Sequence, residues 1–155
     1  MSVNQRRRFL LKGVLGAAIA ALTTVLPRFV FGAWPEQAFR TKNVPDTLQA
    51  LFGTASVITD TKGITLSVTD LAENGAVVPV TVTSTLPGVD SIALMVDKNP
   101  STLAAQFLLA PGLKPFIKTN IKMAETSRVI ALVRSEGKLY STNKKVKVTL
   151  NGCSS

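Results

Sequence analysis

The sequence of 155 residues contains no histidine and only one cysteine. Without histidine, the chain cannot form a Ser-His-Asp triad, a Cys-His pair or a histidine-rich zinc or copper site. A single cysteine cannot form an intramolecular disulfide, a CxxC redox pair or the ligand set of an iron–sulfur cluster. The chemistry that remains possible is that of carboxylates, of lysine or of one thiol.

Aromatic residues are also few, because the chain has one Trp and one Tyr. The formal net charge of +9 is concentrated at the N-terminus: five of the 18 basic residues and none of the 9 acidic ones lie within the first 33 residues. The rest of the chain therefore has a net charge of +4, which is ordinary for a protein surface. Basic patches interleaved with aromatic side chains are absent, so we expect no nucleic-acid partner.

The N-terminus has the pattern of a twin-arginine export signal, which begins with Arg6, Arg7, Arg8, Phe9 and Leu10. An uncharged stretch, Gly13–Leu26, follows and precedes Pro27. A membrane-anchoring helix is the alternative, but this stretch is shorter than the roughly 18 to 20 residues needed to cross a bilayer. We therefore predict that residues 1–33 are a cleaved signal, that the mature protein is periplasmic, and that it has no membrane anchor after cleavage.

The segment that follows the signal has one helical stretch. The run Glu36–Phe52 carries apolar residues at helical spacing, with Asp46 as the predicted N-cap and Gly53 as the stop. Beyond Gly53 the hydrophobic period changes to two, which is typical of strands with one buried face. Pro79 falls within one of these runs and predicts an edge or bulged position.

Residues 34–150 are predicted to form one all-β domain. The expected strands are the runs starting at Ile64 and Val78, then Ser91–Asp97, Leu103–Ala110, Phe116–Met123, Arg128–Ser135 and Lys138–Leu150, the last broken at Thr142-Asn143. Turn signals rich in Gly, Pro and Asn separate nearly all of them. About seven short strands without intervening helices predict an immunoglobulin-like antiparallel β-sandwich, with a small barrel as the alternative.

The charged side chains of this domain do not form an evident catalytic group. The carboxylates are scattered at predicted strand ends and turns, where they normally serve solvation and local hydrogen bonding. The basic cluster Lys144, Lys145 and Lys147 is expected to be a solvated or edge-protecting strand face. No acid–base pair can be proposed from the spacing, so we expect a protein that is not an enzyme.

Cys153 is the residue that packing does not explain. It lies beyond the last hydrophobic strand residue, Leu150, in a short polar tail of Asn151, Gly152, Cys153, Ser154 and Ser155 that we expect to be mobile. The residues leave open an incidental thiol, an intermolecular disulfide, and a thiol presented on an arm to other proteins. A module that binds a metal or a sulfur oxyanion without a covalent bond is a further alternative, although no ligand cluster supports it.

Several segments resemble SoxY, the carrier subunit of the periplasmic sulfur-oxidation (Sox) system. They are Ala33-Trp34-Pro35, the run from Glu73 to Val80, Ile92-Ala93-Leu94, Lys98-Asn99-Pro100, the run from Ile121 to Ser127, Gly137-Lys138-Leu139-Tyr140 and Val146-Lys147-Val148-Thr149. Together with the twin-arginine leader they cover nearly the whole mature chain.

The resemblance implies an immunoglobulin-like sandwich and a specific role for Cys153, namely the covalent attachment of sulfur intermediates on a C-terminal arm, residues 151–155. It implies a SoxZ-like partner subunit and transient contacts with a haem enzyme (SoxAX), a hydrolase (SoxB) and in some cases a sulfane dehydrogenase (SoxCD). No cofactor is implied beyond the sulfur bound to Cys153.

The tail departs from the family pattern, which is Gly-Gly-Cys-Gly-Gly. Here it reads Asn151-Gly152-Cys153-Ser154-Ser155, so three of the four flanking glycines are replaced. Asn and Ser are small and polar but have less backbone freedom than glycine. We therefore expect a modified arm that still carries sulfur, with a changed fit to the usual partner enzymes.

Overall fold

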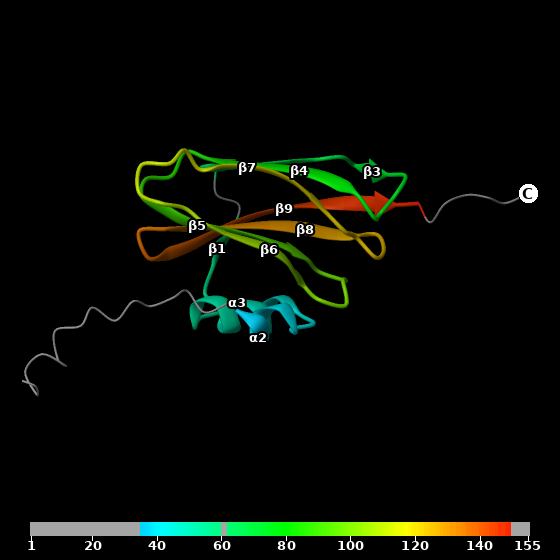
Figure 1. The fold of residues 1–155 in the computed structure, drawn as a ribbon, viewed down its shortest axis with the longest axis horizontal. Helices are drawn as coiled ribbons and strands as arrows, with labels where there is room; N and C mark the ends of the chain where they lie inside the picture. Colours follow the sequence, from blue (N-terminus) through cyan, green and yellow to red (C-terminus); the bar gives the residue numbers. More distant parts are fainter. Residues whose placement is uncertain (1–34, 60–61, 150–155) are drawn as a thin grey trace, which may run out of the picture. The chain divides into compact units, whose positions relative to one another are not determined.

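A computed structural model describes residues 35–59 and 62–149 of the chain. They form two packed β-sheets, with a short helical segment against the outer face of one sheet (Figure 1). The elements are α2 (Glu36–Phe39), α3 (Val44–Phe52), β1 (Ile58–Thr59), β2 (Ile64–Val68), β3 (Leu71–Ala72), β4 (Val78–Ser84), β5 (Val89–Val96), β6 (Leu103–Leu108), β7 (Phe116–Ile121), β8 (Ser127–Ser135) and β9 (Lys138–Val148).

The larger sheet has six strands in the order β1-β9-β8-β5-β6, with β3 also pairing with β9. The smaller sheet has the order β2-β4-β7. The long strands pair antiparallel, whereas the two-residue strands β1 and β3 both pair parallel with β9. The predicted immunoglobulin-like antiparallel sandwich is confirmed, and the small barrel is excluded because the strands form two separate sheets.

The core between the sheets arises from the alternation of side chains along each strand. In β7, Ile117 and Ile121 point inward while Lys118 and Asn120 are exposed, as the sequence predicted. The central strands β5 and β8 are instead buried on both faces. One face of each contributes to the core between the sheets, and the other packs under the helices with residues such as Met95 and Leu132.

The helical segment consists of two helices rather than the single predicted run. The predicted N-cap at Asp46 is wrong: the cap of α3 is Asn43, whose side-chain Oδ1 accepts a hydrogen bond from the Asp46 backbone N–H at 2.9 Å. Asp46 lies in the first turn, where its negative charge still favours the helix. Gly53 ends α3 in the left-handed conformation at φ 68°, as predicted.

The last strand also differs from its prediction, because β9 is continuous through Thr142 and Asn143. Both residues pair with β8, with Ala131 and Ile130 respectively, and these ladder contacts hold the two polar residues in extended backbone. Pro79 lies in β4, the middle strand of its sheet, but beyond the end of β2, because Val80 is the last β4 residue paired with β2. Its local environment is therefore that of an edge, where a missing N–H removes no ladder bond.

No helix within residues 35–59 and 62–149 is long and apolar enough to cross a membrane.

Candidate functional site

The end of β9, where the polar tail begins, is fixed to the sandwich on two sides. On one side, Lys147 N–H donates to the carbonyl oxygen of Asp70 at 2.9 Å, and Thr149 N–H donates to that of Ala72 at 3.1 Å. On the other side, Val148 N–H donates to Thr126 Oγ1 at 3.0 Å. The chain is therefore held in place as far as Thr149, the last described residue.

The loop that contains Gly75 packs tightly against this strand end. The carbonyl oxygen of Gly75 accepts a hydrogen bond from Met123 N–H at 2.7 Å. A Cβ atom at Gly75 would lie 2.3 Å from the carbonyl oxygen of Met123 and 2.9 Å from Cγ1 of Val148. Only a residue without a side chain allows the backbone to approach β9 this closely. A hollow of about 190 Å³ lies here, lined by Asn74, Gly75, Ala76, Lys122, Met123, Ala124, Val148 and Thr149.

The predicted tail residues Asn151, Gly152, Cys153, Ser154 and Ser155 lie outside the described residues, as do the signal residues Arg6, Arg7, Arg8, Phe9 and Leu10. The structure does position Val148 and Thr149, the residues at the end of β9 from which the tail continues; we call them the root of the tail. Four peptide units connect Thr149 to Cys153, which limits the distance between their Cα atoms to about 14 Å. The length of the chain therefore bounds how far Cys153 can reach from the last point at which the sandwich holds the backbone.

Lys144, Lys145 and Lys147, in the second half of β9, do not all lie on the same face of the strand. Lys144 points toward the smaller sheet, and its Nζ lies 3.0 Å from Asp70 Oδ1 and 2.8 Å from the carbonyl oxygen of Val68. Lys145 and Lys147 are exposed on the outer face. The expected basic cluster is thus divided: Lys144 protects the end of β2, and the other two side chains are solvated.

Five of the eight carboxylates in the described part of the chain form ion pairs with nearby basic side chains. Each of the following pairs is at least partly exposed: Asp90 with Arg134, Asp97 with Arg128, Glu125 with Lys98, Asp70 with Lys144 and Glu36 with Arg40. Within the described part of the chain, no group of three or more Cys, Asp or Glu residues could hold a metal ion.

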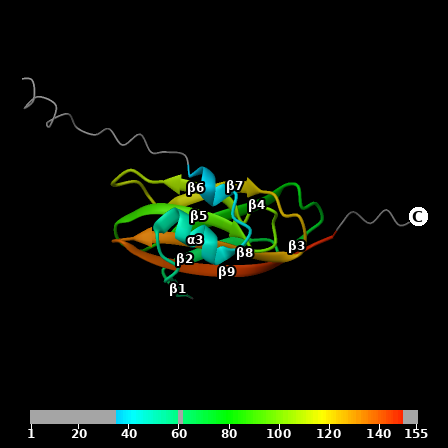
Figure 2. The same cartoon turned by 90° about the horizontal axis from the view of Figure 1, so that it is seen from below.

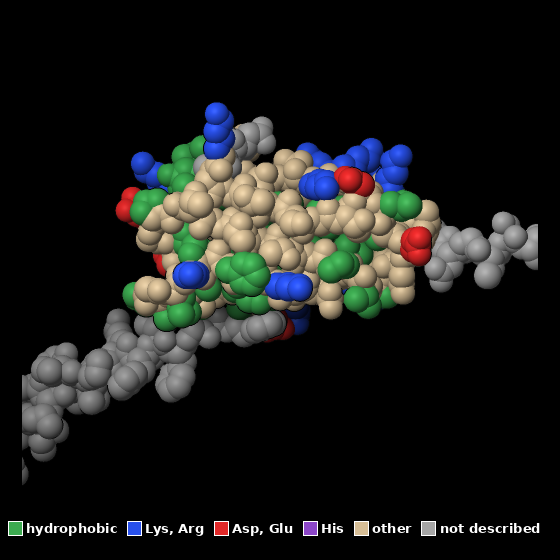
Figure 3. All heavy atoms as spheres, turned by 90° about the horizontal axis from the view of Figure 1, so that it is seen from above, with side chains coloured by type: hydrophobic (Ala, Val, Ile, Leu, Met, Phe, Trp, Pro, Cys, Tyr) green, Lys and Arg blue, Asp and Glu red, His purple; other side chains and the backbone are tan. Residues whose placement is uncertain are grey.

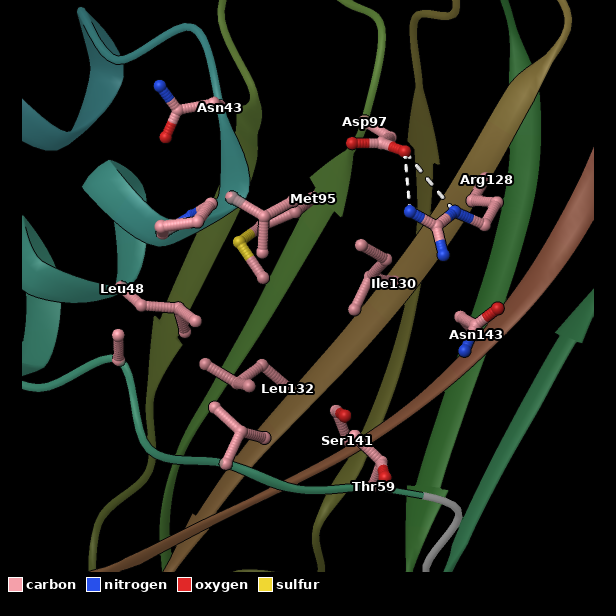
Figure 4. Close-up of a pocket in the computed structure, with 14 residues that line it drawn as sticks. Asn43, Leu48, Thr59, Met95, Asp97, Arg128, Ile130, Leu132, Ser141 and Asn143 are labelled. Atoms are coloured by element: carbon pink, nitrogen blue, oxygen red, sulfur yellow. Dashed lines mark hydrogen bonds and ion pairs between the residues drawn. The ribbon is translucent and has the colours of Figure 1, made fainter.

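A larger cavity of about 430 Å³ lies between α3, β1 and the outer face of the larger sheet (Figure 4). Its apolar side is formed by Leu48, Met95, Ile130 and Leu132. On its rim, Arg128 donates from Nε and Nη2 to a single oxygen, Oδ2 of Asp97, at 3.2 and 2.8 Å. The Arg128 charge is largely balanced by this pair, and the described lining residues include no Cys or Lys and no carboxylate other than Asp97.

The architecture defines a class of protein: an immunoglobulin-like β-sandwich whose last strand leads directly into a short tail with the only cysteine of the chain. The sequence model of one family, described as sulfur oxidation protein SoxY, matches residues 48–153. The match covers most of the chain and ends at Cys153, and the chain belongs to the SoxY family.

A solved structure supports this membership. The sulfur carrier protein SoxY from Chlorobium limicola f thiosulfatophilum is 34% identical to this chain, with a TM-score of 0.64, and the alignment covers 75% of this chain and 100% of that one. Superoxide reductase (neelaredoxin) from Ignicoccus hospitalis is similar at 14% identity and a TM-score of 0.53, covering 60% of this chain and 95% of that one, which shows only a shared fold. No curated protein sequence matches this chain.

Sequence reasoning found the tail but missed what holds its root. Glu73-Asn74-Gly75 is one of the turn signals between the predicted strands, which does not indicate a contact with β9, and the sequence predicts no role for Thr126. Both belong to segments that carried the family resemblance, the runs from Glu73 to Val80 and from Ile121 to Ser127, and the structure places these two runs against the end of β9. The family resemblance of these two runs was the only sequence signal. Their contact with the end of β9 could be seen only in the three-dimensional structure.

Proposed function

We propose that this protein is a covalent carrier of thiosulfate-derived sulfur on Cys153. The observation that carries the proposal is the extent of the SoxY family match, which ends at this cysteine. The anchored end of β9 supports it, because hydrogen bonds hold the chain to the sandwich as far as Thr149, four residues before Cys153. A thiol that follows so closely on a fixed strand end is suited to carry a group.

The proposed loading step joins the Cys153 sulfur to the outer sulfur of thiosulfate. The thiol loses its proton, an S–S bond forms, and two electrons leave to the haem enzyme of the system, which is the oxidant. The product is a cysteine S-thiosulfonate. Hydrolysis then breaks the bond between the outer sulfur and the sulfonate group, releases sulfate and leaves one added sulfur atom on the cysteine. In this scheme the carrier itself needs no cofactor and catalyses no step.

The partners in this proposal are a SoxZ-like subunit and, transiently, SoxAX-, SoxB- and SoxCD-like enzymes. The leader with Arg6, Arg7 and Arg8 is proposed to direct export by the twin-arginine route, so the carrier works in the periplasm without a membrane anchor. Because that compartment is oxidising, an unpaired cysteine there is either protected, cross-linked or used for its reactivity. Carriage of sulfur is the use that the family membership favours.

The proposal is tested by replacing Cys153 with Ser in a strain that has no other SoxY-type protein. We expect thiosulfate oxidation to fall to background and the intact mass of the purified protein to show no sulfur adduct. Ser154→Ala, one residue away, is the matched control and should keep both. Full thiosulfate oxidation by the Cys153→Ser strain would overturn the proposal.

The alternative is a sandwich protein that Cys153 cross-links to another chain. Mass spectrometry without reductant distinguishes the two, because a carrier yields an adduct of thiosulfonate or of single sulfur atoms, whereas a cross-link yields a protein–protein disulfide. Addition of reductant should remove either group. Only disulfide-linked chains, isolated from cells grown on thiosulfate, would support the alternative.

The replaced glycines of the tail can be tested separately. The triple variant Asn151→Gly, Ser154→Gly and Ser155→Gly restores the family pattern around Cys153. If the tail is adapted to its own enzymes, the variant should be loaded faster than the natural protein by a SoxAX enzyme from a Gly-Gly-Cys-Gly-Gly system, and no faster by the enzyme of its source. Equal rates for both proteins with both enzymes would show that the tail sequence does not set partner choice.

A further inference from the structure

The outer face of the larger sheet carries positive charge at the end nearest the root of the tail. Arg128 of β8 and Lys145 of β9 lie directly opposite each other in the antiparallel ladder, and Lys147 follows two residues later on the same face of β9. All three side chains are exposed, whereas the adjacent Val129 and Val146 point into the core. We call Arg128, Lys145 and Lys147 the basic strip. Figure 2 shows that the helices cover part of this face and that the end of β9 extends beyond them.

Few acidic groups balance the basic strip. Arg128 is paired with Asp97, but Lys145 and Lys147 form no ion pair within residues 35–59 and 62–149. On another side of the root, the exposed Lys122 lines the hollow described above. In the space-filling view of Figure 3, Lys and Arg side chains gather at the right end of the upper margin, the side on which β9 lies, whereas the broad face between the margins carries few charges.

Stability of the fold does not explain the basic strip. Like charges at directly opposite positions of an antiparallel pair destabilise a sheet, and the ladder places Arg128 opposite Lys145. Protection of an open strand edge does not explain it either, because β8 has a neighbour on each side and β3 pairs with β9 at Lys147. Residues that oppose the preference of their own element are expected where a protein binds another molecule.

The basic strip lies where an enzyme that acts on Cys153 has to approach. Lys147 is two residues before Thr149, and the Cα atom of Cys153 is at most about 14 Å from that of Thr149. The strip extends over about 7 Å along β9 and about 5 Å across to β8. Its exposed cations lie side by side and do not converge on one point, as the polar groups of a small-anion site do. Such a surface fits a row of carboxylates on another protein.

We propose that the basic strip is a docking surface for an acidic rim around the active-site entrance of the enzymes that load and unload Cys153. The inference rests on the proposed carrier function and adds to it the surface and the chemistry of recognition. Exposed charges of opposite sign raise the rate of encounter more than the affinity. That balance suits a carrier, which has to reach several enzymes in turn and leave each of them again.

The first test measures kcat/KM for loading of the exported protein by the loading enzyme of its source. This value should fall about tenfold between about 10 mM and about 0.3 M salt, because salt screens exposed charges. Replacing Lys145 and Lys147 with Gln should lower it about fivefold or more in low salt and weaken the salt dependence, with kcat at saturating carrier unchanged.

The matched control replaces Lys118 and Lys138 with Gln. Both lysines are exposed and lie outside the basic strip, so this variant loses the same charge. It should keep nearly all of the natural kcat/KM. Equal losses in the two double variants would overturn the proposal, because total charge rather than the strip would then govern encounter.

The second test requires no sulfur chemistry. The exported protein with Cys153→Ser is isotope-labelled and titrated with the loading enzyme, and NMR records its amide shifts. The amides of Arg128, Lys145 and Lys147 should shift in low salt and return to their free positions in high salt. If the natural protein is loaded but these amides do not shift, the docking inference is wrong and the carrier function stands. If they shift but the natural protein cannot be loaded, the carrier function is wrong and the docking surface stands.

Three controls separate docking from other roles of the two lysines. A raised KM for thiosulfate, with kcat/KM for the carrier unchanged, would show that the strip binds the small anion and would contradict the proposal. Alkylation of Cys153 by iodoacetamide, a neutral reagent, should proceed at the same rate in the natural protein and in the variant; a changed rate would mean that the lysines act on the thiol itself. Lys145→Gln should unfold at a temperature no lower than the natural protein, because it removes a like-charge pair. A marked loss of stability would assign Lys145 to the fold instead.

Discussion

At the scale of single residues, Gly75 is the glycine of the described chain with the least space for a side chain. Its substitution by Ala would place a Cβ 2.3 Å from the Met123 carbonyl oxygen, and the hydrogen bond from Met123 N–H to Gly75 opposes any shift of the loop. We expect Gly75→Ala to lower the free energy of unfolding by about 1–3 kcal/mol, as overpacking does.

Urea denaturation measures the effect of Gly75→Ala, and Ala76→Ser is its control, because Ala76 is the exposed neighbour and should change stability by less than about 0.5 kcal/mol. Equal stability of the two variants would mean that the loop can move away from β9. In that case the root of the tail would be less firmly held than the contacts indicate.

A second residue-scale prediction concerns the helix cap. Asn43 both accepts from the Asp46 backbone N–H and donates from Nδ2 to Asp46 Oδ2 at 2.7 Å. Asn43→Ala should therefore cost about 1 kcal/mol of stability by removing the cap. Asp46→Asn keeps the capping bond and should cost less in the same thermal unfolding assay. A larger loss for Asp46→Asn would show that charge near the helix start, rather than the cap, stabilises α3.

The helix start also shows where sequence reasoning stops at this scale. Both Asn43 and Asp46 are good capping residues, and the choice between them depends on where the chain leaves the extended conformation. Asn43 has φ −146° and ψ 160°, and the helix begins at Val44 with Pro45 in its first turn. Proline at the second helical position was the sequence signal that favoured the earlier start.

At the scale of elements, the hairpin between β8 and β9 contains an unfavourable residue. Its two turn residues, Glu136 and Gly137, have φ of 49° and 75°, which is the pattern of a type I′ turn. Asn is preferred over Glu at the first position because it adopts positive φ more readily. Glu136→Asn should stabilise the protein by a few tenths up to about 1 kcal/mol.

Thermal unfolding tests the hairpin prediction, with Glu136→Ala as the comparison, since Ala has neither the Glu side chain nor the Asn preference. A gain for Asn without a gain for Ala supports the turn argument. If both variants are stabilised equally, the cause is instead the loss of the Glu136 side chain, which lies close to Gly88. A Cβ atom built at Gly88 would be 3.2 Å from Glu136 Cγ.

Strand periodicity predicted most elements of this fold, because each long strand has at least one clearly buried face. It failed at Thr142 and Asn143, where local composition resembled a turn. These residues are extended because β8 pairs with them, and pairing between strands is not a local property. The short strands β1 and β3 were missed for the same reason: two residues carry no period, and only their contact with β9 makes them strands.

At the scale of the whole molecule, the sequence predicted the sandwich and located the thiol-bearing tail, but not the strand order. The order decides that Glu73–Val80 and Ile121–Ser127 meet at the root of the tail, and that β6 rather than β4 has an open edge. Both facts depend on contacts between distant segments. A single sequence shows which face of each strand is apolar. It does not show which strands lie next to one another in the sheets.

The fold and the carrier function are expected to be separable. The last described hydrogen bond of the chain to the sandwich is that from Thr149 N–H to the carbonyl oxygen of Ala72, and among residues 35–59 and 62–149 the last fully buried core residue is Val146. A chain truncated after Thr149 should therefore unfold with a free energy within about 0.5 kcal/mol of that of the complete chain. The same truncation should abolish sulfur loading as completely as Cys153→Ser. Chemical denaturation and intact mass after incubation with thiosulfate and the loading enzyme measure the two properties. A marked loss of stability would show that residues 150–155 belong to the fold, and Cys153 would then sit on a structured element instead of a separate arm.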